Sequence, residues 1–146
     1  PIVIKAIPKA QLVLAGRNMP PEFKSNLTSG ISVVGEVADA SEFLNRPGIM
    51  TIPLHSGSGM RIKAVEGMAA GKPTVSTELG VRGIGVIDGK HVLISDEAEG
   101  FASSIIVLLQ DSEKAREIAE CGKQYVREHF SNNKIIDKLV KFLGQL

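Results

Sequence analysis

The chain has little of three things: cysteine, long apolar runs and an excess of charge of one sign. Its single cysteine, Cys121, excludes a disulfide scaffold and agrees with a reducing cytoplasm, where we expect the protein to reside. No run approaches the roughly 20 apolar residues that span a bilayer, and no signal-peptide pattern precedes the first strand-like segment. The net charge of +1 argues against nucleic acid as a partner.

A composition with 43% hydrophobic residues can still bury a core, so we expect one domain over residues 1–146. Short segments rich in β-branched residues predict buried parallel strands. They are 11–16, 31–35, 49–53, 74–77 and 91–95. Helical patterns lie at 21–27, 40–44, 60–70, 97–110, 112–130 and 133–143, with a loop-rich link at 80–90. This alternation is typical of an α/β fold with a Rossmann-like, doubly wound parallel sheet followed by C-terminal helices.

The most informative stretch is PLHSGSGMRIKAVEGMAAGKPTVST, residues 53–77, where a loop of small residues opens into a helix. Unpaired amides at a helix start favour an anion, and glycines let the anion come close. We therefore predict that the amides of Ser58, Gly59 and Met60, with Gly57 beside them, bind a phosphate group. In an open parallel sheet, the loop after the 49–53 strand is also where topology places a ligand.

Charged side chains follow on the same predicted helix. Arg61 and Lys63 put two positive charges in its first turn, which is unfavourable unless an anion lies between them. Glu66 projects near these cations and could accept hydrogen bonds from both hydroxyls of a ribose. The helix should end at Gly71 in a left-handed cap.

Small residues near the end of that helix predict its packing. We expect Ala69 and Ala70 to let the helix lie close to the sheet.

Other motifs are incomplete. Lys72 and Lys90 each follow a glycine, but neither completes GxxxxGK[ST], and GSGMRI lacks the third glycine of a dinucleotide fingerprint. His91 and His129 have no partners at metal-ligand spacing and are interpreted as structural or surface residues, and His55 as a loop residue. There is no DxD pair to hold a divalent ion, so we predict neither a metal nor a cofactor.

GSGMRIKAVEGMAAGKPTVST is similar to the signature of two-domain GT-B glycosyltransferases of the family 4 (group 1) type. The resemblance continues through GVRGIGVIDGKHVLISDEAEGFASSIIVLLQD and covers residues 7 to about 130. It implies the C-terminal, donor-binding half of a retaining hexosyltransferase whose N-terminal, acceptor-binding half is absent. The implied donor is a UDP-, GDP- or ADP-hexose and the acceptor a glycan, lipid or metabolite, as in polysaccharide biosynthesis.

Within this resemblance, Glu66 matches the second glutamate of the family's EX7E pattern, which holds the donor ribose. The amides of residues 58–60 match the diphosphate-binding helix start. Arg61 and Lys63 match only a sub-branch that reads GSGxRxKxxE, and we assign them to the catalytic group. Ser58 stands where the wider family has its first glutamate, and a serine can hydrogen-bond a sugar hydroxyl but cannot carry charge.

The family's first strand, with the arginine and lysine that follow it, has no counterpart before Pro1. We therefore expect weak donor binding and no turnover by this chain alone. Arg17, at the end of the 11–16 strand, is a further candidate for contact with phosphate or ribose.

The vacant strand position leaves three alternatives. The 11–16 and 49–53 strands pair directly, residues 2–7 form a strand, or a second copy fills the vacancy as a homodimer.

Two other function classes share these features. A GT-B nucleotide-sugar epimerase would need acid and base residues, of which only His55 is near. A non-catalytic module would bind the nucleotide alone.

The last helical segment is amphipathic, with apolar residues on one face and Lys134, Lys138 and Lys141 around it. In a whole enzyme this face would pack on the acceptor-binding half; peripheral membrane contact is the alternative.

Overall fold

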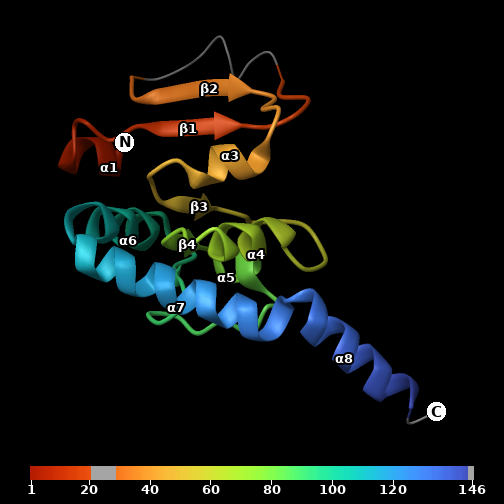
Figure 1. Cartoon of the computed structure of the whole chain (residues 1–146). Helices are drawn as coiled ribbons and strands as arrows, with labels where there is room; N and C mark the ends of the chain where they lie inside the picture. The colour runs from red at the N-terminus through yellow and green to blue at the C-terminus, as the bar shows by residue number, and fades with distance from the viewer. Residues whose placement is uncertain (21–28, 145–146) are drawn as a thin grey trace. The chain divides into compact units, whose positions relative to one another are not determined.

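The structure is a computed structural model that describes residues 1–20 and 29–144. The helix predicted at 21–27 lies outside the described residues. The chain divides into two compact units, Pro1–Pro47 and Gly48–Leu146 (Figure 1), and each is described by itself. The expectation of a single domain therefore stays a prediction.

The first unit contains α1 (Ile2–Ala6), β1 (Leu12–Ala15), β2 (Ile31–Gly35) and α3 (Ala40–Asn45). β1 and β2 are parallel, with Leu12 opposite Ile31. The helix predicted at 40–44 is confirmed, and its start is capped by Asp39, whose carboxylate accepts a hydrogen bond from the Ser41 amide at 2.7 Å. The alternative that residues 2–7 form a strand is wrong, because Ile7 N donates to Val3 O at 2.7 Å and closes a helical turn.

The second unit is built around a three-stranded parallel sheet in the order β3-β4-β5. The strands are β3 (Met50–Ile52), β4 (Thr74–Ser76) and β5 (Leu93–Ile94). The helices are α4 (Ile62–Ala69), α5 (Glu78–Val81), α6 (Ala98–Gln110), α7 (Ser112–Phe130) and α8 (Asn132–Leu143). Thr51 lies opposite Val75, and Val75 lies opposite Leu93.

All five predicted strands form, and every pairing is parallel, which confirms the α/β fold class. They form two sheets, β1-β2 in the first unit and β3-β4-β5 in the second. The alternative that the 11–16 and 49–53 strands pair directly would join the two units and stays a prediction. The third alternative, a second copy at the vacant position, stays a prediction.

The core of the second unit forms where α4 and α7 pack together and against the sheet. On α4 the buried positions are Ala64, Gly67 and Met68, which share one helix face. A Cβ at Gly67 would collide with the sulfur of Met50 on β3, so this glycine sets the close approach of helix and strand. The expectation that Ala69 and Ala70 let the helix lie close to the sheet is wrong, because Ala69 is exposed and Ala70 is only half-buried.

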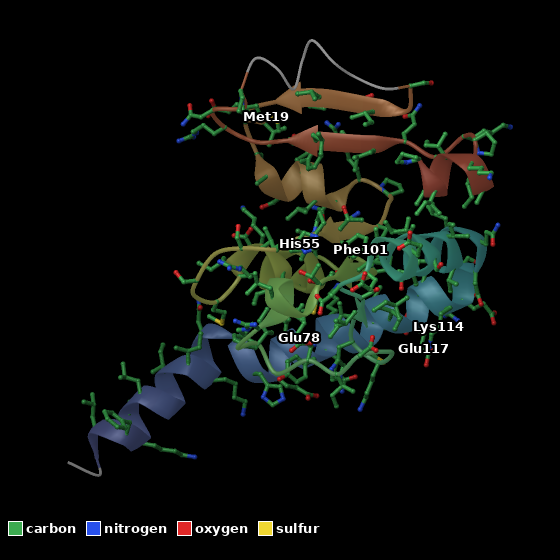
Figure 2. The ribbon with its side chains drawn as sticks, turned by 180° about the vertical axis from the view of Figure 1, so that it is seen from behind. Met19, His55, Glu78, Phe101, Lys114 and Glu117 are labelled. Atoms are coloured by element: carbon green, nitrogen blue, oxygen red, sulfur yellow. The ribbon has the colours of Figure 1, made fainter. Side chains whose placement is uncertain are left out.

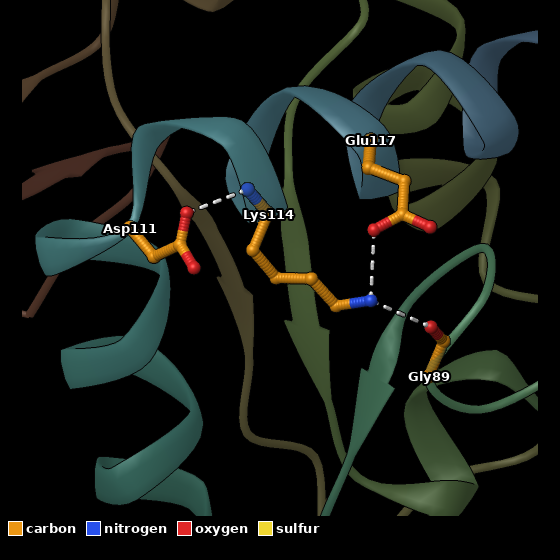
Figure 3. A network of polar contacts seen from close by, with 4 residues as sticks. All are labelled: Gly89, Asp111, Lys114 and Glu117. Carbon is orange, nitrogen blue, oxygen red and sulfur yellow. Dashed lines mark hydrogen bonds and ion pairs between the residues drawn. The ribbon is translucent and has the colours of Figure 1, made fainter.

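The ends of α4 and α7 are fixed by local hydrogen bonds. Gly71 adopts the predicted left-handed cap, with φ of +71°, and Lys72 N donates to Gly67 O at 3.0 Å. At the start of α7, the Asp111 carboxylate accepts from the Lys114 amide at 2.8 Å (Figure 3). The Lys114 ammonium then bridges the Glu117 carboxylate at 3.0 Å and the Gly89 carbonyl at 3.5 Å, which ties the loop before β5 to α7.

Candidate functional site

The predicted anion-binding residues lie in the loop that leaves the carboxyl end of β3. Gly57 and Gly59 adopt left-handed conformations, with φ of +118° and +80°, and residues 56–60 are exposed. These glycines keep the chain out of the helix, so α4 begins at Ile62 with Arg61 as its N-cap. The expectation that Ser58, Gly59 and Met60 belong to the helix start is wrong in this respect. The first helical amides are those of Ile62 and Lys63, and residues 58–60 form the loop in front of them.

The Arg61 guanidinium folds back against this loop. Its Nη1 donates to the Ser58 carbonyl at 2.6 Å. Its Nε and Nη2 atoms are buried and have no hydrogen-bond partner among the described residues. Buried donors without acceptors cost about 1–3 kcal/mol each, more for a charged group. An anionic oxygen bound at the loop would supply the missing acceptors.

Lys63 and Glu66 lie one turn apart on α4 and pair with each other. The Lys63 ammonium donates to Glu66 Oε2 at 2.7 Å, and the two side chains are 70% and 42% exposed. An exposed pair of this kind contributes about 0–1 kcal/mol. A ligand that binds either group can therefore separate them at little cost.

Sequence reasoning missed the residue that holds the start of the loop. Thr77 is 1% exposed, and its hydroxyl donates to the Leu54 carbonyl at 2.6 Å. The same hydroxyl accepts from the Gly80 amide at 3.2 Å and thereby caps α5. A threonine directly after a buried strand and before a short helix is a capping signal that could have indicated it.

Arg17, the remaining candidate, lies in the first unit. Its Nε donates to Glu36 Oε1 at 2.8 Å, and both side chains are exposed. This ion pair joins the ends of β1 and β2. The predicted contact of Arg17 with a ligand stays a prediction.

A shallow pocket lies elsewhere in the second unit, beside α5. It is lined by Glu78, Val81, Arg82, Ile84, Val86 and Ile94 together with two glycines, Gly83 and Gly85. None of the sequence-predicted site residues lines it. His55, the one candidate near the loop for the acid and base residues of an epimerase, is an exposed residue of the loop after β3 (Figure 2). In the described residues, no three histidine, cysteine, aspartate or glutamate side chains gather as a metal-binding group.

His91 is structural, as its sequence context indicated. It is 6% exposed, its Nδ1 accepts from the Ile87 amide at 3.0 Å, and its ring lies 4.5 Å from that of Tyr125. Tyr125 in turn lies 4.4 Å from the ring of His129 and donates to the Ile84 carbonyl at 3.0 Å. Burial lowers the pKa of His91 below its ordinary value, with a further lowering by the charges of Lys90 and His129.

Acid should therefore destabilise the second unit through His91. The unfolded chain takes up the His91 proton at a higher pH than the folded chain. The contribution of neutral His91 to the free energy of unfolding is therefore fully present above the ordinary histidine pKa of about 6.5 and is lost as pH falls below it. Urea unfolding at a series of pH values measures this slope. In His91→Asn, which retains an acceptor, the slope should flatten; an unchanged slope would assign the acid sensitivity to other groups.

The two left-handed glycines of the loop allow a matched comparison. A Cβ at Gly57 would lie 2.7 Å from Arg61 Nη2, whereas a Cβ at Gly59 would meet nothing within 4 Å. Both alanine variants bear the same kind of backbone strain, about 1 kcal/mol or more. Only Gly57→Ala displaces the guanidinium, so we expect it to weaken nucleoside diphosphate binding several-fold more than Gly59→Ala. Isothermal titration of both variants measures the difference, and equal affinities would contradict the role given to Arg61.

Thr77 has a matched control in Thr74, a fully buried threonine whose hydroxyl donates to the Lys72 carbonyl at 3.0 Å. Valine at either position removes a buried hydrogen bond and should cost about 1–3 kcal/mol of stability. Only Thr77→Val releases Leu54, which leads into the loop. We expect Thr77→Val to lower nucleotide affinity in titrations below the unfolding temperature, and Thr74→Val to leave it unchanged.

Comparisons with known proteins show the family of this chain. The family described as "Glycosyl transferases group 1" matches residues 1–111. An uncharacterised glycosyltransferase of Methanocaldococcus jannaschii is 30% identical over 84% of this chain and 35% of its own length. A phosphatidyl-myo-inositol mannosyltransferase of Mycobacterium leprae is 25% identical over 88% of this chain and 36% of its own.

Solved structures show the same fold. The Anabaena protein HepE, solved with UDP, has a TM-score of 0.82 at 18% identity, over 99% of this chain and 44% of its own. The C-terminal domain of a Francisella tularensis group 1 glycosyltransferase has a TM-score of 0.75 at 22% identity, over 90% of this chain and 75% of its own. These likenesses show that the α/β fold is the one found in these glycosyltransferases. Together with the family match, they confirm the resemblance inferred from sequence. The chain belongs to the group 1 glycosyltransferase family. It spans 35% to 39% of the length of the curated relatives that it matches.

Proposed function

We propose that this chain is the donor-binding half of a retaining glycosyltransferase that transfers a hexose from a nucleoside diphosphate sugar to a glycan, lipid or metabolite. Family membership and the cationic loop after β3 support this proposal. UDP-, GDP- and ADP-hexoses all carry the required diphosphate. Because HepE was solved with UDP and with UDP-glucose, a UDP-hexose is the donor to test first.

The observation that carries the proposal is the Arg61 guanidinium, which lies beside a glycine loop and has two buried nitrogen atoms without acceptors among the described residues. In the proposed complex, the donor diphosphate accepts hydrogen bonds from Arg61 and from the amides of residues 58–60. Lys63 leaves Glu66 and turns to the phosphate, and the freed Glu66 carboxylate accepts from the ribose hydroxyls. Charge-assisted hydrogen bonds of this kind contribute about 1.5–3 kcal/mol each.

The proposed reaction breaks the bond between the sugar C1 and the β-phosphate oxygen. The electron pair leaves with the diphosphate, and Arg61 and Lys63 stabilise the charge that develops there. An acceptor hydroxyl adds to C1 on the same face and passes its proton to the departing diphosphate oxygen, so the configuration is retained. Because the two side chains supply positive charge, the proposal requires no metal and no cofactor.

A thermal shift experiment tests the proposal, because a ligand that binds the folded chain raises its unfolding temperature. We expect UDP-hexose to raise the unfolding midpoint more than UDP does. We also expect the midpoint shifts with GDP-hexose and ADP-hexose to differ from the shift with UDP-hexose. If bare and sugar-bearing nucleotides act alike, the chain is a non-catalytic nucleotide-binding module. If no diphosphate nucleotide acts and an unrelated anion does, the transferase proposal fails.

We further propose that the 146-residue chain binds donor weakly and does not turn it over. It spans 44% of HepE, and Ser58 supplies no charge where the wider family has a glutamate. Release of UDP from UDP-glucose, followed over time, should stay at the uncatalysed rate.

The remaining partners proposed from sequence are an acceptor-binding half and a second copy of the chain. The proposed location is the cytoplasm.

A further inference from the structure

The α5 pocket, which is the shallow pocket lined by residues 78, 81–86 and 94, lies at the carboxyl edge of the β3-β4-β5 sheet. Glu78 and Val81 belong to the helix that follows β4, and Ile94 is the last residue of β5. The loop after β3 leaves the same edge of this parallel sheet, which is the edge where open α/β sheets bind ligands. The pocket has a volume of about 350 Å³, within the range of about 300–1,000 Å³ typical of small-molecule sites.

The lining of the α5 pocket is mostly aliphatic, and its walls are held from outside. Val81 and Ile84 are buried and belong to the core of the second unit. The Tyr125 hydroxyl donates to the Ile84 carbonyl at 3.0 Å, which ties the loop after α5 to α7. The Asp88 carboxylate accepts from the Ile94 amide at 2.8 Å, which ties the same loop to β5. The pocket is therefore formed before any ligand binds, so a ligand has little ordering to supply.

Two opposite charges line the α5 pocket without pairing. Glu78, labelled in Figure 2, and Arg82 are exposed, and neither side chain has a hydrogen-bond or ion-pair partner among the described residues. Residues one turn apart on a continuous helix would lie close enough to pair. α5 ends at Val81, however, and Arg82 has an extended ψ of 131°, which breaks the helical spacing. The pocket therefore offers one group that accepts hydrogen bonds and one that donates them, and the two charges cancel.

This combination is complementary to a pyranose ring. A hydroxyl group both donates and accepts hydrogen bonds, so one sugar can donate to the Glu78 carboxylate and accept from the Arg82 guanidinium. The C–H groups of the ring are apolar and match the aliphatic lining, which includes Val86 and Ile94. A simple anion or cation would be attracted by one of the two charges and repelled by the other.

The α5 pocket is separate from the predicted phosphate site. Of the described residues that line the pocket, none belongs to the loop after β3 or to α4. Thr77 stands between the two sites, because its hydroxyl donates to the Leu54 carbonyl at 2.6 Å and the next residue, Glu78, lines the pocket. The hexose of a bound donor is bonded directly to the diphosphate and is expected beside the loop after β3. A sugar in the α5 pocket is therefore a second sugar.

We propose that the α5 pocket binds a neutral pyranose ring of the glycosyl acceptor. The Glu78 carboxylate accepts hydrogen bonds from ring hydroxyls, the Arg82 guanidinium donates to hydroxyl oxygens, and the aliphatic lining contacts the C–H groups. This inference rests on the proposed transfer reaction, and it gives the donor-binding half an acceptor subsite of its own.

Nuclear magnetic resonance titration of the isotope-labelled chain tests both sites separately. The amide signals of Gly83 and Gly85 report on the α5 pocket, and those of Gly57 and Gly59 report on the loop after β3. We expect neutral methyl hexosides at millimolar concentrations to shift the first pair, and UDP to shift the second. If UDP shifts the loop signals and no methyl hexoside shifts the pocket signals, the acceptor subsite is overturned and the donor proposal stands. Pocket shifts without any effect of UDP would support the sugar site and contradict the donor proposal alone.

Charge-removing variants with matched controls test the two polar groups. Arg82→Gln and Glu78→Gln should each weaken methyl hexoside binding by about 10-fold or more, because each removes a hydrogen bond to a charged group. Arg116→Gln and Glu120→Gln make the same changes at exposed positions of α7 and should leave sugar binding unchanged. Equal losses in the pocket variants and in the controls would overturn the proposal.

Two further ligands distinguish a neutral acceptor from other occupants. We expect glucuronate to bind no tighter than methyl glucoside, and Arg82→Gln to bind UDP-glucose with the affinity of the unsubstituted chain. Tighter binding of glucuronate that Arg82→Gln abolishes would assign the pocket to a carboxylate and overturn the proposal. If Arg82→Gln weakens the binding of UDP-glucose but not of UDP, the pocket holds the donor hexose, which would also overturn it.

Discussion

Replacing Arg61 by alanine should reduce the affinity for a nucleoside diphosphate by about 10- to 150-fold. The range follows from the loss of one charge-assisted contact of about 1.5–3 kcal/mol. Both Nε and Nη2 are available because neither has an acceptor in the described residues, while Nη1 already binds the Ser58 carbonyl. The ligand-free stability should not fall in parallel, since truncation also removes two buried donors without partners. Calorimetric titration with UDP, together with urea unfolding, separates the two quantities.

The control for this prediction is Arg116→Ala. Arg116 is an exposed arginine on α7, so its removal changes the net charge equally without touching the loop after β3. We expect a nucleotide Kd within about twofold of the unsubstituted chain. If Arg61→Ala and Arg116→Ala bind UDP with the same affinity, the guanidinium beside Gly57 has no part in recognition.

Replacing Met68 by alanine should cost about 2–5 kcal/mol of unfolding free energy, because the side chain is fully buried. Met68 lies on the buried face of α4, in a cluster with Ile52 and Val126, and a Cβ at Gly122 would lie 3.4 Å from its Cγ. A loss of this size is a large fraction of the ~5–15 kcal/mol typical of a domain. Chemical denaturation measures it directly.

Met60→Ala is the matched control, because it makes the same chemical change at a side chain that is 49% exposed. Its effect on stability should stay within about 0.5 kcal/mol. Comparable losses for Met60→Ala and Met68→Ala would contradict the packing of α4 described above.

The strands could be predicted from sequence because their signal is local. Each is a short run of β-branched residues, and the 31–35 strand was located without error in its bounds. The cap of α3 by Asp39 and the left-handed end of α4 at Gly71 are likewise local chemistry. Residues 2–7 have a β-branched composition, but Pro1 at the N-cap and the bond from Ile7 N to Val3 O make them helical.

Parts of the site depend on contacts that sequence does not display. The small residues before Arg61 indicated a helix start, yet the positive φ values of Gly57 and Gly59 delay α4 to Ile62. Glycine is compatible with a helix start and with a left-handed loop, so composition alone does not decide between the two conformations. The hydroxyl bond from Thr77 to Leu54 joins residues 23 positions apart, and no periodic pattern signals it. Gly67, and not Ala69, meets the sheet because Met50 lies opposite it.

The most direct test of the central claim is a crystal structure of this chain soaked with UDP. The account predicts diphosphate oxygens within hydrogen-bond distance of the Arg61 guanidinium and of the amides of residues 58–60. It also predicts that Glu66 contacts the ribose and no longer pairs with Lys63, to which it is joined at 2.7 Å in the ligand-free chain. UDP bound at another place, with the pair of Lys63 and Glu66 intact and the loop after β3 unchanged, would contradict it.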